Sequence, residues 1–123
     1  MRKYAEDKWT IKEVLQHIID AERVFSYRAM CFARKEQSIL PSFDENSYTI
    51  NSYANDRDWN EMIAEVTATR KSSKYLFNSF TDDALNAIGK ASDYTISVAA
   101  LGFITVGHLE HHIRIIQERY IGV

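Results

Sequence analysis

The sequence predicts an all-α protein, and three observations lead to that prediction. Proline and glycine are scarce, with one and four residues in a chain of 123, so few positions favour the turns of a β protein. Apolar residues recur at helical spacing over three long segments. A good N-cap residue stands at the start of each segment. We therefore expect one helical-bundle domain over residues 1–123, more than half of it helical and without a sheet.

The first helix is expected over residues 10–35. Thr10 and Glu13 have the spacing of a capping box, in which the hydroxyl reaches the third amide while the carboxylate reaches back. One face of the helix then carries residues at helical spacing, namely Val14, His17, Ala21, Val24, Arg28 and Cys31. A helix of this length is about 40 Å long, which suits a bundle.

The helical periodicity stops over residues 36–57, a segment that contains the only proline, Pro41. A loop of this length is unusual in a compact domain and is often functional. Because it also contains aromatic and aliphatic side chains, we expect it to pack across one end of the bundle. The second helix is expected over residues 58–80, with Asp58 as its N-cap. Thr81 and the two aspartates after it either end this helix or cap a short turn.

The third helix is expected over residues 97–120, with Ser97 as its N-cap. Its first half, residues 98–109, is apolar nearly all round, which is typical of a buried helix. The second half carries charged side chains and should emerge towards water. Residues 89–94 interrupt the pattern before it.

Charge and composition exclude several classes of protein. The net charge is -2, with 15 basic and 17 acidic residues spread along the chain, and no basic stripe indicates nucleic-acid binding. The longest uncharged stretch, residues 94–109, is too short and too polar for a membrane span. Cys31 has no partner for an internal disulfide, and no signal peptide is visible, so we expect a cytoplasmic protein.

Histidines provide the strongest functional signal. His108 and His112 are four residues apart, so on a helix they share a face and can chelate one ion. His17 lies in the middle of the apolar face of the first helix, which makes it a candidate third ligand. His111 falls to one side of that line. From the residues alone two interpretations stay open. The histidines either bind a metal ion or serve as hydrogen-bonded packing residues of the core.

Three segments carry a resemblance to a known family: KWTIKEVLQHIIDAERVF at 8–25, LPSFDENSY at 40–48 and ISVAALGFITVGHLEHHIRIIQERY at 96–120. In their order and spacing they resemble the DinB-like superfamily, which includes YfiT-type metal-dependent hydrolases. The resemblance implies a four-helix bundle. It also implies a divalent metal ion held by His17, His108 and His112, while His111 is not required.

The resemblance also implies a helix before the segment at 8–25, and here only Met1 to Lys8 precede Trp9. We therefore expect three of the family's four bundle helices. Three helices would leave an apolar groove open to water, which soluble monomers avoid. We therefore expect a homodimer, in which a second copy of the chain covers this groove, unless the chain is a fragment of a longer protein.

Two functions from different classes follow. The first is a metal-dependent enzyme, a hydrolase or a thiol-dependent transferase, that acts on a small molecule. The second is a non-catalytic metal-binding bundle that serves as an interaction module. Zinc and nickel both suit imidazole ligands, and three neutral histidines should bind more weakly below about pH 6.5.

No catalytic residue is identified among the other side chains. Asp20, three residues after His17, is a candidate partner for its free ring N–H. The capping role of Glu13 accounts for that residue, and Glu110 is interpreted as a solvated or salt-bridged carboxylate. Arg28 suits an anionic substrate or an ion pair with Glu22. Cys31 is interpreted as a small core residue.

Overall fold

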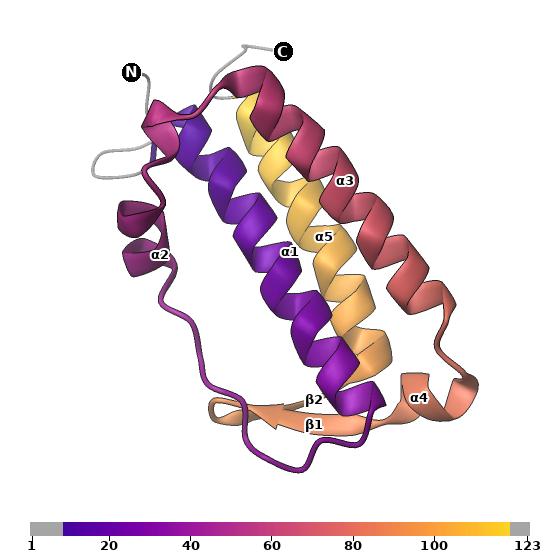
Figure 1. The fold of residues 1–123 in the computed structure, drawn as a ribbon. Helices are drawn as coiled ribbons and strands as arrows, with labels where there is room; N and C mark the ends of the chain where they lie inside the picture. Colours follow the sequence, from indigo (N-terminus) through magenta and orange to yellow (C-terminus); the bar gives the residue numbers. More distant parts are fainter. Residues whose placement is uncertain (1–8, 119–123) are drawn as a thin grey trace.

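The computed structural model describes residues 9–118 and is mostly helical. Its long helices are α1 (Ile11–Ala33), α3 (Trp59–Asn78) and α5 (Val98–Ile116). These bounds confirm the three expected helices to within a few residues, although the end expected near residue 120 lies outside the described range. Figure 1 shows the three helices side by side along their length.

The start of each long helix is capped as expected. Thr10 and Glu13 form both bonds of the capping box at the start of α1. Asp58 accepts from the Glu61 amide at the start of α3, and Ser97 accepts from the Ala100 amide at the start of α5. These side chains satisfy amides that the first helical turn leaves without a partner.

The connection between α1 and α3 contradicts the expected position. It runs along α1 from one end of the bundle to the other (Figure 1), instead of across one end. It also contains α2 (Glu45–Ser52), which packs against α1, and a 3₁₀ turn at Ala54–Asp56. Asp44 caps α2 by accepting from two backbone amides, which explains why this polar stretch becomes helical.

A small sheet contradicts the expectation that none would form. After the short helix α4 (Asp82–Asn86), which Thr81 caps, strands β1 (Ile88–Ala91) and β2 (Tyr94–Ser97) pair as an antiparallel hairpin. The turn between them places Ser92 at a positive φ of 55°. Sequence patterns indicate this hairpin only weakly, because each strand has four residues and the turn lacks the usual Asn-Gly or Asp-Gly pair.

Close packing against α1 holds the hairpin at the end of the bundle. Leu40 bonds through its backbone to Lys90 and Ser92, which fixes the connection to the hairpin. A methyl group on Gly89 would overlap the ring of Phe32, which is fully buried. Glycine is therefore the residue that lets β1 approach α1 this closely.

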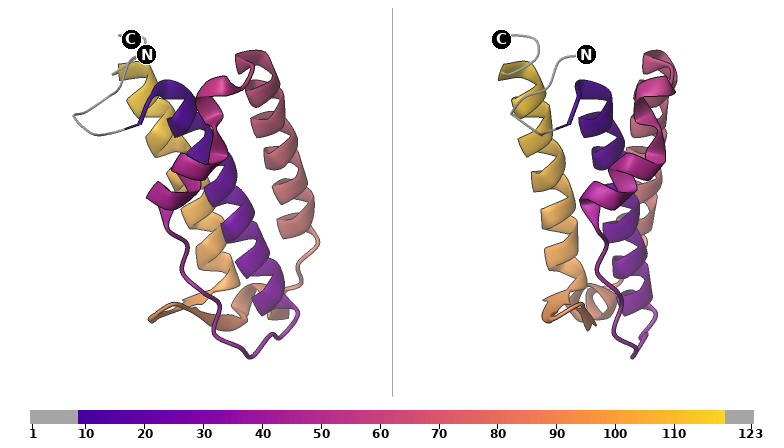
Figure 2. Two further views of the ribbon diagram at one scale, coloured as in Figure 1. Left: turned by 60° about the vertical axis from the view of Figure 1, so that its left-hand side comes forward. Right: turned by 90° about the vertical axis from the view of Figure 1, so that its left-hand side faces the viewer.

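Helix α1 is the central helix of the bundle. It contacts both α5 and α3, and both views of Figure 2 show it between them. One cluster of buried side chains lies around Val14, Ile18 and Met62, and a second lies around Phe32 and Leu101 near the hairpin. The first cluster surrounds the half of α1 that carries His17.

Helix α5 is less buried than its composition predicted. Leu101 and Thr105 are buried, but Phe103 is 81% exposed and Ile104 is 43% exposed, although both lie in the stretch 98–109 expected to be buried. The reason is that α1, α4 and β2 are the main neighbours of α5 in the described chain, while α3 makes little contact with it. In the described part of the chain, no helix is both long enough and apolar enough to cross a membrane.

Candidate metal centre

The structure brings the three predicted histidines together. His17 comes from the first half of α1, and His108 and His112 come from successive turns of α5. The Nε2 atom of His108 lies 3.0 Å from that of His17 and 3.1 Å from that of His112. One potential ligand atom from each of the three residues lies within 4.8 Å of the others. The pair from one helix and the single histidine from another thus converge on one point.

Apolar and aromatic side chains enclose the cluster. His17 is 3% exposed and His112 is 8% exposed, while His108 is half-buried. The ring of Trp9 lies 4.7 Å from that of His17, and the ring of Phe25 lies 5.7 Å from that of His108, edge to face. The sequence analysis assigned no role to Trp9. The signal that could have indicated one is the position of this aromatic residue directly before the N-cap of α1.

Burial keeps the three imidazoles neutral at pH 7. It lowers the pKa of His17 from 6.5 to about 4, with a further contribution from His112. Burial also lowers the pKa of His108 and of His112 to about 4, and neighbouring histidines add to the effect. The pH dependence of metal binding stays a prediction, and these lowered pKa values move the pH at which protons should compete with the metal below the unperturbed value of 6.5.

The arrangement of the nitrogens fits a bound cation better than a hydrogen-bonded cluster. A ring nitrogen of a neutral imidazole carries either one proton or one lone pair. His108 Nε2 faces two other ring nitrogens, so hydrogen bonding can satisfy only one of these contacts. A divalent ion at about 2.0–2.1 Å from each nitrogen spaces tetrahedral ligands about 3.3 Å apart, which is close to the two separations of 3.0 and 3.1 Å. Three lone pairs directed at one ion would satisfy every contact.

The expected carboxylate partner of His17 is not where the sequence suggested. Asp20 accepts a hydrogen bond from Gln16 Nε2 at 3.0 Å, and burial raises the pKa of its carboxyl group. His112 Nδ1 is buried and has no hydrogen-bond partner among the described residues. We therefore attribute the orientation of the histidine rings mainly to packing against their neighbours and not to hydrogen bonds with carboxylates.

The remaining candidates lie away from the cluster. Glu13 caps α1 as expected, Glu110 is exposed, and Cys31 packs half-buried against the second core cluster. Glu22 does not pair with Arg28, because it forms a buried ion pair of 3.0 Å with Arg70 of α3.

Arg28 instead donates to the Tyr94 hydroxyl at 2.8 Å and to the Pro41 carbonyl at 2.9 Å. The sequence could not reveal these partners, because they come from the hairpin and from the long connection.

Comparison with known proteins identifies the family and the fold. The family model of the DinB superfamily matches residues 2–116. The solved structure of YfiT from Bacillus subtilis, described as a probable metal-dependent hydrolase with an unusual four-helix bundle topology, superposes with a TM-score of 0.80 at 21% identity. The match covers 95% of this chain and 68% of that one. A search of curated proteins found no match.

Proposed function

This chain belongs to the DinB superfamily, and from that premise we propose that it is a metal-dependent enzyme acting on a small molecule. The proposed ligands of the divalent ion are His17, His108 and His112. The observation that carries the proposal is the convergence of their three Nε2 atoms in a buried cluster. The description of YfiT as a probable metal-dependent hydrolase supports it.

The chain's own residues prepare the site in three ways. The neutral rings offer lone pairs without first having to lose protons, because burial has already lowered their pKa. The Trp9 and Phe25 rings exclude water from part of the cluster. Three protein ligands leave a position for a substrate atom, as in catalytic sites, whereas structural zinc sites usually have four.

A divalent cation bound here would supply Lewis acidity to an oxygen or sulfur atom of the substrate. Hydrolysis and transfer of a small thiol are the two reactions that we propose on this basis. Zinc or nickel is the proposed ion, because both suit imidazole ligands. A reducing cytoplasm is the proposed compartment, since it suits a chain with the single thiol of Cys31.

Metal analysis of purified protein tests the ligand set. The wild type should bind about one zinc or nickel ion per chain, and His17→Ala, His108→Ala and His112→Ala should each lose stoichiometric binding, because each removes one of three ligands. His111→Ala is the matched control, since this exposed ring lies next to the cluster on the same helix. Stoichiometric binding that survives His17→Ala but fails with His111→Ala would refute the assignment.

Turnover separates the enzyme from the second candidate, a non-catalytic metal-binding interaction module. The zinc- or nickel-loaded protein should hydrolyse an activated ester or amide, or consume a small thiol in the presence of an electrophile. Chelation and His112→Ala should both abolish that activity. Full metal occupancy without turnover on a broad panel of either type would favour the interaction module.

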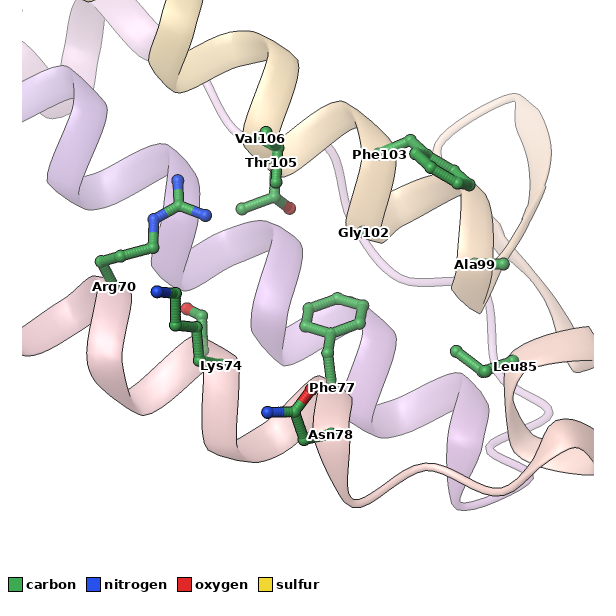
Figure 3. A pocket seen from close by; sticks show the side chains of 11 residues that line it. Arg70, Lys74, Phe77, Asn78, Leu85, Ala99, Gly102, Phe103, Thr105 and Val106 are labelled. Carbon is green, nitrogen blue, oxygen red and sulfur yellow. The ribbon is translucent and has the colours of Figure 1, made fainter.

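We also propose a homodimer, with the exposed side of α5 and the adjoining side of α3 as its interface. A pocket of about 400 Å³ lies between them, and Figure 3 shows Phe77 of α3 facing Gly102 of α5 across it. The exposed Phe103 stands at its edge. Twofold packing would cover this apolar surface on both copies at once.

Sedimentation tests the dimer. Phe103→Asp should shift the mass from two chains to one, while Tyr75→Asp, at another exposed aromatic residue, should leave it unchanged. A wild-type monomer at micromolar concentration would contradict the proposal. Binding of a different protein on this surface would contradict it as well.

A further inference from the structure

A second pocket lies between α1 and the long connection, away from the histidines. Its volume is about 260 Å³, close to the lower end of the range for small-molecule sites. Arg23, Tyr27 and Arg28 line it from α1, while Phe43 and Tyr48 line it from the connection and α2. Its lining contains two arginines and no acidic side chain.

Arg28 is the residue that makes this pocket unusual. It is only 5% exposed, yet none of the ion pairs in the described range 9–118 involves it. Its two protein bonds go to neutral oxygens, those of the Tyr94 hydroxyl and the Pro41 carbonyl. These bonds use two of the five N–H donors of a guanidinium. A buried charge without a counter-ion is costly, so a ligand that supplies a negative charge would stabilise this arrangement.

A second, partly buried arginine beside α1 shows the contrast. Arg70 lies opposite the buried carboxylate of Glu22, 3.0 Å away, so its charge is compensated inside the protein. Arg23, which lines the pocket together with Arg28, pairs with Glu65 at 2.8 Å. Among the arginines of the described residues named here, only Arg28 is deeply buried and forms no ion pair with a carboxylate.

Aromatic rings determine what kind of anion fits. Phe43 and Tyr48 pack edge to face with their ring centroids 5.2 Å apart, and Tyr27 lies on the α1 side. These surfaces suit a flat apolar group. The volume of about 260 Å³ has room for one ring and one anionic group.

We propose that this pocket binds a small organic anion, a carboxylate or a phosphate ester with one aromatic or similarly flat apolar group. Arg28 holds the anionic group through its free N–H donors, and the rings of Phe43 and Tyr48 contact the apolar part. Along α1, eleven residues or about 16 Å separate Arg28 from His17. The site is therefore distinct from the histidine cluster and does not depend on the proposed function.

Binding of phenyl phosphate to chelated, metal-free protein tests the site, because chelation prevents phosphate from binding a metal ion. Calorimetry should give one site per chain with a Kd of about 1 mM or tighter. Arginine side-chain NMR on the wild type should show the Arg28 signals shifting along the same binding curve. This second readout needs no variant, so it holds even if a substitution disturbs folding.

Three variants separate ligand binding from a purely structural role of Arg28. Arg28→Gln should weaken binding about tenfold or more, since it removes a charge-assisted contact. Phe43→Ala should weaken binding of phenyl phosphate but not of inorganic phosphate. Arg114→Gln, at an exposed arginine of α5, is the control and should change nothing.

Each alternative outcome overturns the proposal. No saturable binding at millimolar phenyl phosphate would leave Arg28 as a structural link between Pro41 and Tyr94. The same conclusion follows if binding occurs while the Arg28 signals stay fixed. Equal binding by wild type and a folded Arg28→Gln variant would place the ligand elsewhere.

Discussion

The buried histidines should make the metal-free protein sensitive to mild acid. In the unfolded chain an imidazole takes up a proton as the pH falls through about 6.5. In the folded chain burial holds the pKa of His17, His108 and His112 near 4. Between these pH values the unfolded state binds more protons. Stability is therefore fully present above pH 6.5 and is lost as the pH falls towards 4.

The size of the effect follows from the shift. A pKa lowered from 6.5 to about 4 corresponds to about 3 kcal/mol for one ring, at about 1.4 kcal/mol per pH unit. With three such rings, the free energy of unfolding should fall by up to about 4 kcal/mol per pH unit near pH 5.5. A typical domain is stable by about 5–15 kcal/mol, so a metal-free protein at the low end of that range should unfold near about pH 5, and a more stable one should lose a large part of its stability by then.

Urea unfolding in a chelating buffer, followed by circular dichroism from about pH 7.5 to about pH 4.5, measures this slope. His112→Gln should reduce the slope by about 1.4 kcal/mol per pH unit, because it removes one titrating ring. His111→Gln, at an exposed neighbouring position, should change the slope much less, because His111 is the smallest of the causes that lower the pKa of His108 and His112. A wild-type free energy of unfolding that stays constant between pH 7 and pH 5 would refute the reasoning.

Four further predictions concern stability and can be checked by thermal or urea unfolding. Gly89→Ala should destabilise the protein by about 1–3 kcal/mol, because the new methyl group overlaps the buried Phe32 ring; an unchanged midpoint would contradict the close approach of β1 to α1. Glu22→Gln should cost about 3 kcal/mol, since it leaves the Arg70 guanidinium without its buried partner, whereas a neutral effect would show that water already compensates that charge. Thr10→Ala should cost about 1 kcal/mol through loss of the helix cap, and a cost below a few tenths would mean that the cap contributes little. Added zinc or nickel at about 100 times its Kd should stabilise the wild type by about 2.7 kcal/mol, and the absence of any such gain would count against the metal site.

Local chemistry explains what the sequence predicted correctly. Thr10, Asp58 and Ser97 cap their helices because a side-chain oxygen and an amide two or three residues later are neighbours in any helix start. His108 and His112 share a face because four residues make about one helical turn. Such relations depend on spacing along the chain, so they can be read without knowledge of the rest of the fold.

The errors arose where distant segments meet. The hairpin of β1 and β2 was missed because four-residue strands carry little periodicity, and its position depends on contacts with Phe32 and Leu40. The connection was expected at one end of the bundle because nothing in its sequence shows that α2 packs along α1. The apolar composition of α5 indicated burial, yet burial also requires a neighbour on every side, and α3 makes little contact with α5 in the described chain.

The sequence by itself determined the three long helices, their caps and the shared face of the histidine pair, because hydrogen bonding and helical spacing act between near neighbours. Only the tertiary structure decided that His17 lies against that pair, with its Nε2 atom 3.0 Å from that of His108, and that burial lowers the pKa of all three rings. It also placed Arg28 between Pro41 and Tyr94, where it forms no ion pair with a carboxylate of the described chain. Desolvation and charge compensation depend on what surrounds a side chain in space, and that environment exists only once the helices have packed.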